Sequence, residues 1–333
     1  RKILKNIQKE DFTTVGVGDM SGDVFGNGML LSKHIKMVAA FNHMHIFVDP
    51  NPDPGKSWAE RQRLFNLPRS AWTDYDAKLI SKGGGIFERS AKSVNLSSEI
   101  RAVLDISKST ATPNELIQAI LRAPVELLWF GGIGTYVKAG TESHGEADDR
   151  GNDGLRVNAM ELRCQAIGEG ANLGMTQRAR VEYGLGGGRI NTDSIDNSAG
   201  VDASDHEVNI KILLDSVVAK RKLNQPQRNK LLMSMTNEVG KLVLRDNYLQ
   251  TQAISLEQSL GTAKLDAQAR FMRGLERAHR LDRTVEFLPD DETLEERDKN
   301  KLGLARPELS IMLSYAKLWL YDEILASDLP DDH

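Results

Sequence analysis

Apolar positions over the first 210 residues switch between short continuous runs and helical spacing. The β-branched run at 12–17 (FTTVGV) predicts a strand, and the apolar face of residues 26–41 predicts a helix. A second strand is predicted at 45–49 (HIFVD), which completes a βαβ opening. The pattern therefore predicts an α/β fold built on a Rossmann-like, doubly wound sheet.

Later segments divide the chain into two expected domains. Residues 50–123 are rich in polar groups, with KGGGIF at 82–87, and are interpreted as an insertion. A further strand that runs into a glycine-rich turn is predicted at 125–136, and residues 138–154 are expected to be an exposed loop.

Helical spacing dominates from about residue 205, and Pro307 suits the first turn of a helix over 306–325. We expect a dinucleotide-binding domain over 1–210 and a helical C-terminal region over 211–333.

Composition and charge indicate which binding partners and which cellular location to expect. The chain has 333 residues and a net charge of -4 without a long basic run, so a nucleic-acid partner is not expected. No stretch of about 18 apolar residues occurs, so no membrane partner is expected either. The one cysteine, Cys164, excludes an internal disulfide and fits a reducing compartment, so the expected location is cytoplasmic.

The start of the sequence indicates a piece of a longer protein. It does not begin with Met, and Ile3, Leu4 and Ile7 have the spacing of the end of an amphipathic helix. We therefore expect this chain to be a fragment.

Five glycines stand between residues 15 and 28, directly after the first predicted strand. Gly16, Gly18 and Gly22 follow the pattern G-x-G-x-x-x-G, one residue longer than the common dinucleotide fingerprint. Glycine allows a tight turn with positive φ and lets a pyrophosphate approach the backbone at a helix N-terminus. The turn is predicted to bind a dinucleotide, with Asp19 and Met20 also contacting it.

Asp49 ends the second predicted strand, where a carboxylate accepts hydrogen bonds from a ribose and repels a 2′-phosphate. This position favours NAD over NADP. The alternative is that the glycines mark a plain loop and that Asp49 caps the DPNPDPG bend.

Two other motifs would indicate a P-loop and a metal site, but each lacks a residue that the site requires. PNPDPGKS at 50–57 ends like a P-loop, but Pro50 stands where that motif requires its first glycine. HMH at 43–45 has no third ligand nearby, so no metal is predicted.

Two later stretches resemble the paired active-site loops of the glutamate dehydrogenase superfamily. They are AIGEGANLGMTQRA at 166–179 and DNSAGVDASDHEVNIK at 196–211. The amino-acid sequence of the first 210 residues also resembles that of the large NAD-specific glutamate dehydrogenases of bacteria, of which this chain would be a C-terminal fragment. The resemblance implies that Asn172 and Asn197 lie beside the nicotinamide and that Ser204 holds the distal carboxylate of the substrate.

The resemblance also implies where the reacting residues lie. The superfamily supplies its catalytic lysine and aspartate from an upstream domain, so no catalytic residue is expected in this chain, and the isolated chain is expected to be inactive. The implied reaction is the NAD-dependent oxidative deamination of L-glutamate to 2-oxoglutarate and ammonia, by a protein that is expected to be a homo-oligomer.

Other interpretations remain open at this point. Ser204 and Glu207 form an S-x-x-E capping box, and the two asparagines suit turns. The chain could also be a non-catalytic NAD-binding regulatory module or part of a dehydrogenase of another amino acid, although a hydroxyl at Ser204 argues against an apolar substrate.

Overall fold

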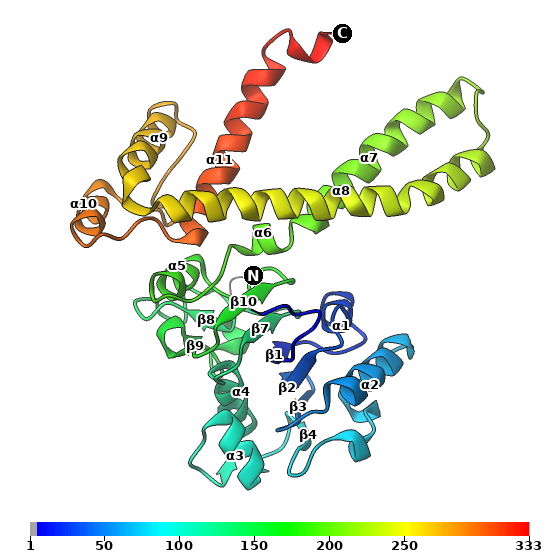
Figure 1. The fold of residues 1–333 in the computed structure, drawn as a ribbon, viewed down its shortest axis with the longest axis vertical. Coiled ribbons are helices and arrows are strands. Elements are labelled where there is room, and N and C mark those ends of the chain that lie inside the picture. Colours follow the sequence, from blue (N-terminus) through cyan, green and yellow to red (C-terminus); the bar gives the residue numbers. More distant parts are fainter. Residues whose placement is uncertain (1–4, 333) are drawn as a thin grey trace.

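A six-stranded sheet with helices on both faces carries a second layer of long helices at one end (Figure 1). The computed structural model describes residues 5–332. Its main sheet comprises β1 (Phe12–Val17), β2 (Ile35–Phe41), β3 (His45–Val48), β4 (Gly85–Glu88), β7 (Leu127–Phe130) and β10 (Ala166–Glu169). Two short ladders pair β5 (Val94–Asn95) with β6 (Thr110–Ala111), and β8 (Val137–Lys138) with β9 (Val157–Asn158). The α/β class predicted from the sequence is confirmed.

The strands of the main sheet lie in the order β10-β7-β1-β2-β3-β4. β10, β7, β1 and β2 are parallel, whereas β3 and β4 are antiparallel to their neighbours. The strand predicted at 12–17 is confirmed, but the helix predicted over 26–41 is wrong in its second half. Helix α1 (Asp23–Leu30) ends early, and Ile35–Phe41 form β2, which is almost fully buried on both faces. A strand buried on both faces has a continuous apolar run that spacing alone does not distinguish from a helix.

Each face of the sheet has its own core. On one face, side chains of β1 and β2 pack against α4 (Pro113–Leu121) and α5 (Gln177–Leu185). On the other, they pack against α1 and α2 (Pro54–Asn66).

Residues 50–123, interpreted from the sequence as an insertion, supply part of this architecture. They contain α2, α3 (Ser98–Leu104), α4 and β4. The KGGGIF stretch, expected to be a loop, runs into β4, which pairs with β3 along its whole length.

Helices form most of the remainder of the described residues. They are α6 (Asp193–Asp196), α7 (Ser198–Ala219), α8 (Gln225–Leu260), α9 (Leu265–Arg277), α10 (Asp291–Lys299) and α11 (Arg306–Leu325). The helix predicted at 306–325 is confirmed, with Pro307 in its first turn.

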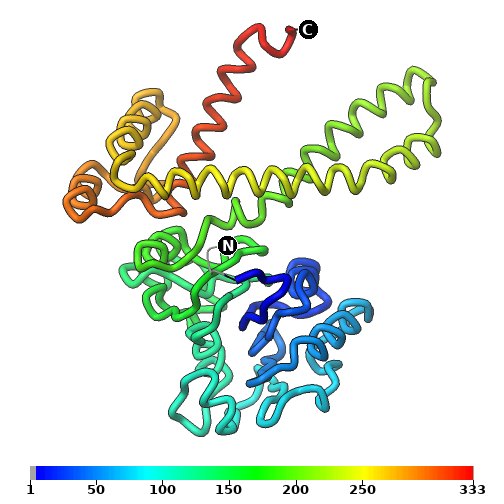
Figure 2. Tube along the Cα trace, viewed as in Figure 1, coloured from blue at the N-terminus to red at the C-terminus, as the bar shows by residue number. Residues whose placement is uncertain are grey.

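Helix α8 has 36 residues and is about 54 Å long. With α7 it forms a hairpin that reaches away from the sheet (Figure 2). A third core joins α8, α9, α10 and α11 to Ile195 of α6. Helix α7 passes through residue 210, so no element ends at the expected boundary between the two domains.

The helix end expected at the start of the sequence falls partly outside the described residues. Ile7 lies in the turn of residues 7–9 and is exposed, whereas Ile3 and Leu4 lie outside the described residues. Among the described residues, no helix is long and apolar enough to cross a membrane.

Candidate nucleotide site

The carboxyl ends of the four parallel strands meet at one edge of the sheet, beneath the long helices (Figure 1). The chain passes from β1 to β2 on one side, whereas β7 lies on the other side of β1, so the order of the strands reverses between β1 and β7. In open α/β sheets, ligands bind in the crevice outside the carboxyl ends at such a point.

The glycine turn between β1 and α1 lies at this edge. Gly18 has φ +139°, and a Cβ there would stand 2.6 Å from the Cβ of Phe25. A Cβ at Gly16 or Gly131 would also meet Phe25, at 2.5 and 2.7 Å. These glycines therefore let Phe25 of α1 pack directly against β1 and the turn after β7. Gly22 is the N-cap of α1 and provides no side chain to cap the first-turn amides.

The two other residues predicted in this turn differ in their surroundings. Met20 is 2% exposed and packs in the core beneath α1, so its side chain does not face a ligand. The carboxylate of Asp19 lies at the surface of the turn. Its Oδ1 accepts hydrogen bonds from the amides of Ser21 (3.0 Å) and Gly22 (3.1 Å) and from the Ser21 hydroxyl (2.7 Å).

Asp49 is not near the turn, and the prediction that it binds the ribose is wrong. Strand β3 runs antiparallel to β2, so its carboxyl end points to the opposite edge of the sheet, and the amide of Asp49 donates to the carbonyl of Val38. The carboxylate is fully buried and accepts hydrogen bonds from the amide and hydroxyl of Ser81. Burial raises the pKa of Asp49. Asp49 therefore has a structural role away from the carboxyl edge.

The two asparagines singled out by the resemblance do come together. Asn197 Nδ2 donates to Asn172 Oδ1 at 3.0 Å, although the two residues are 25 positions apart. Asn172 lies in the loop after β10, whose Ala171 amide donates to the carbonyl of Phe130 at the end of β7. Asn197 stands at the N-cap of α7. Both lie at the same edge of the sheet as the glycine turn.

A buried ion-pair network that sequence reasoning missed holds the loop of Asn172. Glu169, fully buried at the end of β10, forms a bidentate pair with Arg180 (2.7 and 2.9 Å). Arg180 also contacts Asp193 at 3.0 Å, and Asp193 in turn accepts a hydrogen bond from the amide of Leu173 (3.0 Å). The network fixes the backbone on both sides of Asn172.

Two further polar residues hold the start of α7. Asp196 accepts hydrogen bonds from the amide of Glu169 (3.0 Å) and from Asn191 (2.8 Å). Burial raises the pKa of Asp196 to about 6. Asn247 of α8 donates to the carbonyl of Ile195 at 2.7 Å. The only sequence signal for these roles is the TDSID stretch before Asn197, whose acids resemble ordinary loop residues until the fold places them beside Arg180.

A cleft of about 690 Å³ opens beside the asparagine pair. Residues from α6, α7, α8 and α11 line it together with Asn172 and Asn197. Lys317 of α11 is the one lysine or arginine among its lining residues and donates to Gln250 at 2.7 Å. The C-terminal helices thus contribute directly to the cleft.

Ser204 is not among the residues that line this cleft. It is exposed on α7, one turn beyond Val201, which does line it. The capping box predicted for Ser204 and Glu207 is wrong, because α7 begins at Ser198 and Asn197 occupies the N-cap. For the same reason Ser204 does not stand at a helix N-terminus.

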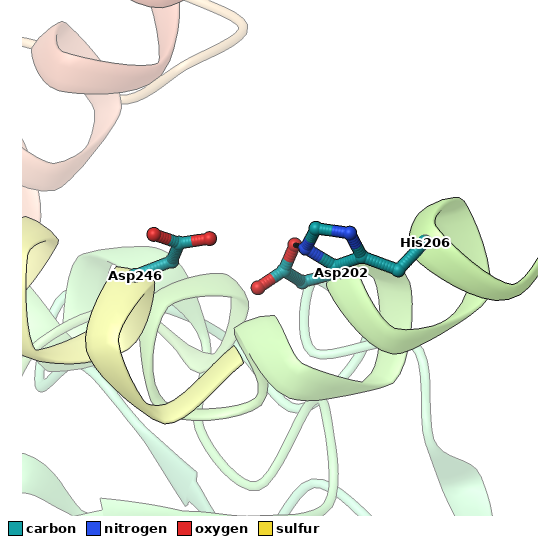
Figure 3. A group of neighbouring side chains, drawn as sticks. All are labelled: Asp202, His206 and Asp246. Carbon is teal, nitrogen blue, oxygen red and sulfur yellow. Dashed lines mark ion pairs between the residues drawn. The ribbon is translucent and has the colours of Figure 1, made fainter. Parts of the chain in front are cut away.

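Asp202 and His206, near the start of α7, lie close to Asp246 of α8 (Figure 3). Each offers one ligand atom, and these atoms lie within 4.8 Å of one another. His206 pairs with Asp202 at 3.4 Å, one turn apart on α7. An ion pair accounts for these two groups, and all three side chains are partly exposed, so the cluster by itself does not indicate a metal site.

Together, the sheet order, the glycine turn and the paired loops after β10 define a Rossmann-like α/β protein. Residues 1–257 match the family described as bacterial NAD-glutamate dehydrogenase, catalytic domain, and residues 301–333 match glutamate dehydrogenase, C-terminal. The chain belongs to the bacterial NAD-glutamate dehydrogenase family, as its two loops predicted.

The relatives that the chain matches are also named as NAD-specific glutamate dehydrogenases. The chain is 58% identical over 327 residues to the NAD-specific glutamate dehydrogenase of Pseudomonas aeruginosa, 54% identical over 327 residues to that of Halomonas elongata, and 52% identical over 337 residues to that of Mycobacterium tuberculosis. These alignments cover 98%, 98% and 99% of this chain but only 20%, 20% and 21% of the relatives. The chain thus spans about a fifth of their length.

Among solved structures, a hetero-hexameric glutamate dehydrogenase from Thermus thermophilus, in a leucine-bound form, is similar at a TM-score of 0.34 and 13% identity. That alignment covers 76% of this chain and 42% of the other. A likeness of this degree carries no argument about assembly.

Proposed function

We propose that the full-length protein oxidises L-glutamate to 2-oxoglutarate and ammonia with NAD, and that this chain supplies the nucleotide-binding part of the enzyme. The observation that carries the proposal is the Asn172–Asn197 hydrogen bond beside a cleft at the carboxyl edge of the sheet. The proposal extends to this chain what the names of its relatives say of them.

The residues at the edge fit a dinucleotide laid across it. Gly22 leaves the first-turn amides of α1 without a side-chain cap, and such amides attract a pyrophosphate. In this arrangement the adenosine lies toward β2 and the nicotinamide toward Asn172 and Asn197. NAD, when bound, accepts the hydride from the substrate.

The protein's own contribution is to position the two reactants. The Glu169–Arg180 pair and the two aspartates hold the loops of Asn172 and Asn197 in place, so these amides are oriented before the ligand arrives. The proton-transferring lysine and carboxylate belong to the part of the protein outside this chain.

The substrate side of the cleft is part of the same proposal. Ser204 is exposed one turn from the cleft and is proposed to meet the distal carboxylate of glutamate when the remainder of the protein closes on α7. A homo-oligomeric state and a cytoplasmic location complete the proposal.

Glutamate-dependent formation of NADH, followed by absorbance, tests the function. The full-length protein should produce NADH from L-glutamate and NAD, and the isolated chain should not. Ser204→Ala should lower activity on glutamate more than activity on norvaline, whereas Ser216→Ala, at an exposed position further along α7, should change neither.

Either of two results would contradict the proposal. Turnover by the isolated chain would mean that its acid-base residues lie within it. NAD binding without any turnover of an amino acid by the full-length protein would favour a regulatory module.

A further inference from the structure

In this chain, an asparagine occupies the position that normally binds the adenine ribose in a Rossmann-like fold. That position is the carboxyl end of the second parallel strand, where most NAD-binding folds place an acid. Strand β2 ends at Phe41, and Asn42 follows it. With Asp49 buried beside Val38 in the middle of β2, no acid of β2 or β3 remains at the carboxyl end of β2 to bind a ribose there.

A carboxylate nevertheless lies beside Asn42, because the glycine turn supplies it. Asn42 Nδ2 donates to Asp19 Oδ2 at 2.9 Å, which joins the turn after β1 to the end of β2. Asn42 cannot rotate freely, since its Oδ1 accepts hydrogen bonds from the amides of Met44 (2.8 Å) and His45 (2.7 Å). Asp19 is fixed as well, because its Oδ1 accepts three hydrogen bonds from Ser21 and Gly22.

The hydrogen bonds that remain unused at this pair match a vicinal diol. Asp19 Oδ2 has a free lone pair after accepting from Asn42, and Asn42 Nδ2 has a second N–H after donating to Asp19. One ribose hydroxyl could donate to the carboxylate while its neighbour accepts from the amide. Both side chains are partly exposed at the carboxyl edge.

Resting on the proposed function, we propose that Asp19, held in place by Asn42, binds the adenine ribose of NAD and excludes a 2′-phosphate. The carboxylate that sets cofactor specificity thus comes from the glycine turn itself. Arg89 places a cation close to this pair, since its guanidinium donates to the carbonyl of Asn42 at 3.0 Å. Without the charge of Asp19, Arg89 would attract a 2′-phosphate, so Asp19 decides between the two cofactors.

Calorimetric titration of the full-length protein tests this assignment. The ligands are NAD and NADP, together with 5′-AMP and adenosine 2′,5′-bisphosphate, which probe the ribose site without the nicotinamide. In Asp19→Asn the ratio of the NADP Kd to the NAD Kd should fall at least about tenfold, with a parallel fall for the two fragments. Asp298→Asn removes the same charge from an exposed position on α10, outside the glycine turn and its helix, and should leave the ratio unchanged.

An exchange of the two side chains provides a rescue. Asp19→Asn keeps the acceptor for the Ser21 and Gly22 amides, and Asn42→Asp keeps the acceptor for the Met44 and His45 amides. The double variant retains one carboxylate at the site and should restore the preference for NAD, with an unchanged melting temperature.

The outcomes separate the two proposals. If the unchanged protein binds NAD while Asp19→Asn leaves the ratio as it was, the ribose assignment is wrong and the function stands. If the unchanged protein binds neither cofactor, the proposed function itself is wrong.

Discussion

The buried pair of Glu169 and Arg180 gives the sharpest stability prediction. Glu169 is 0% exposed and Arg180 4%, and three short contacts join Arg180 to Glu169 and Asp193. Arg180→Met keeps much of the side chain's length but leaves the buried carboxylate without its partner. Breaking a buried pair in this way typically costs about 3–5 kcal/mol. The free energy of unfolding, measured by urea titration, should fall by that amount.

Arg178, on the same helix as Arg180, provides a control with an exposed ion pair. Arg178 pairs with Glu146 at 3.3 Å, with both side chains about half exposed, so Arg178→Met should cost at most about 1 kcal/mol. Adding Glu169→Gln to Arg180→Met should recover part of the loss, because it removes the uncompensated charge. Equal destabilisation by Arg178→Met and Arg180→Met would refute the reasoning.

Three further predictions follow from burial and backbone geometry. Burial raises the pKa of Asp196 from 3.8 to about 6. The stability that the protonated group contributes is therefore present below about pH 4 and lost as the pH rises through 6. Denaturant titrations at several pH values should show that the free energy of unfolding falls across this range, and Asp196→Asn should remove that dependence. Gly18→Ala should lower the melting temperature through its clash with Phe25, whereas Gly240→Ala, with open space around it in α8, should raise stability by up to about 1 kcal/mol. Burial raises the pKa of the Cys164 thiol to about 11, so Ellman's reagent should react with it only after the protein is unfolded.

Local patterns predicted much of the fold. The strand at 12–17 and the helix at 306–325 were predictable because apolar spacing and Pro307 mark their type and ends. Strand β2 was not, since a strand buried on both faces lacks alternation. Because of that error, the second parallel strand was predicted at 45–49, which made Asp49 look like a ribose ligand. Strand direction depends on pairing partners, which spacing does not show.

The candidate site was predictable only in its loops. The resemblance pointed to Asn172 and Asn197, and the structure brings them within hydrogen-bond distance of each other. Arg180 and Asp193 were missed because their role arises from contacts between segments that only the folded chain brings together. The pairing of Asp19 with Asn42, 23 positions apart, was beyond sequence reasoning for the same reason.

The central claim is that NAD lies across the carboxyl edge of the sheet with its nicotinamide at the asparagine pair. Calorimetric titration of the full-length protein and its Asn172→Ala variant with NAD and with 5′-AMP tests it most directly. The account predicts that the variant binds NAD about tenfold more weakly, the loss expected of a missing hydrogen bond in a binding site, while its affinity for 5′-AMP is unchanged. Equal NAD affinity in both proteins, or an equal loss for NAD and 5′-AMP, would contradict this placement.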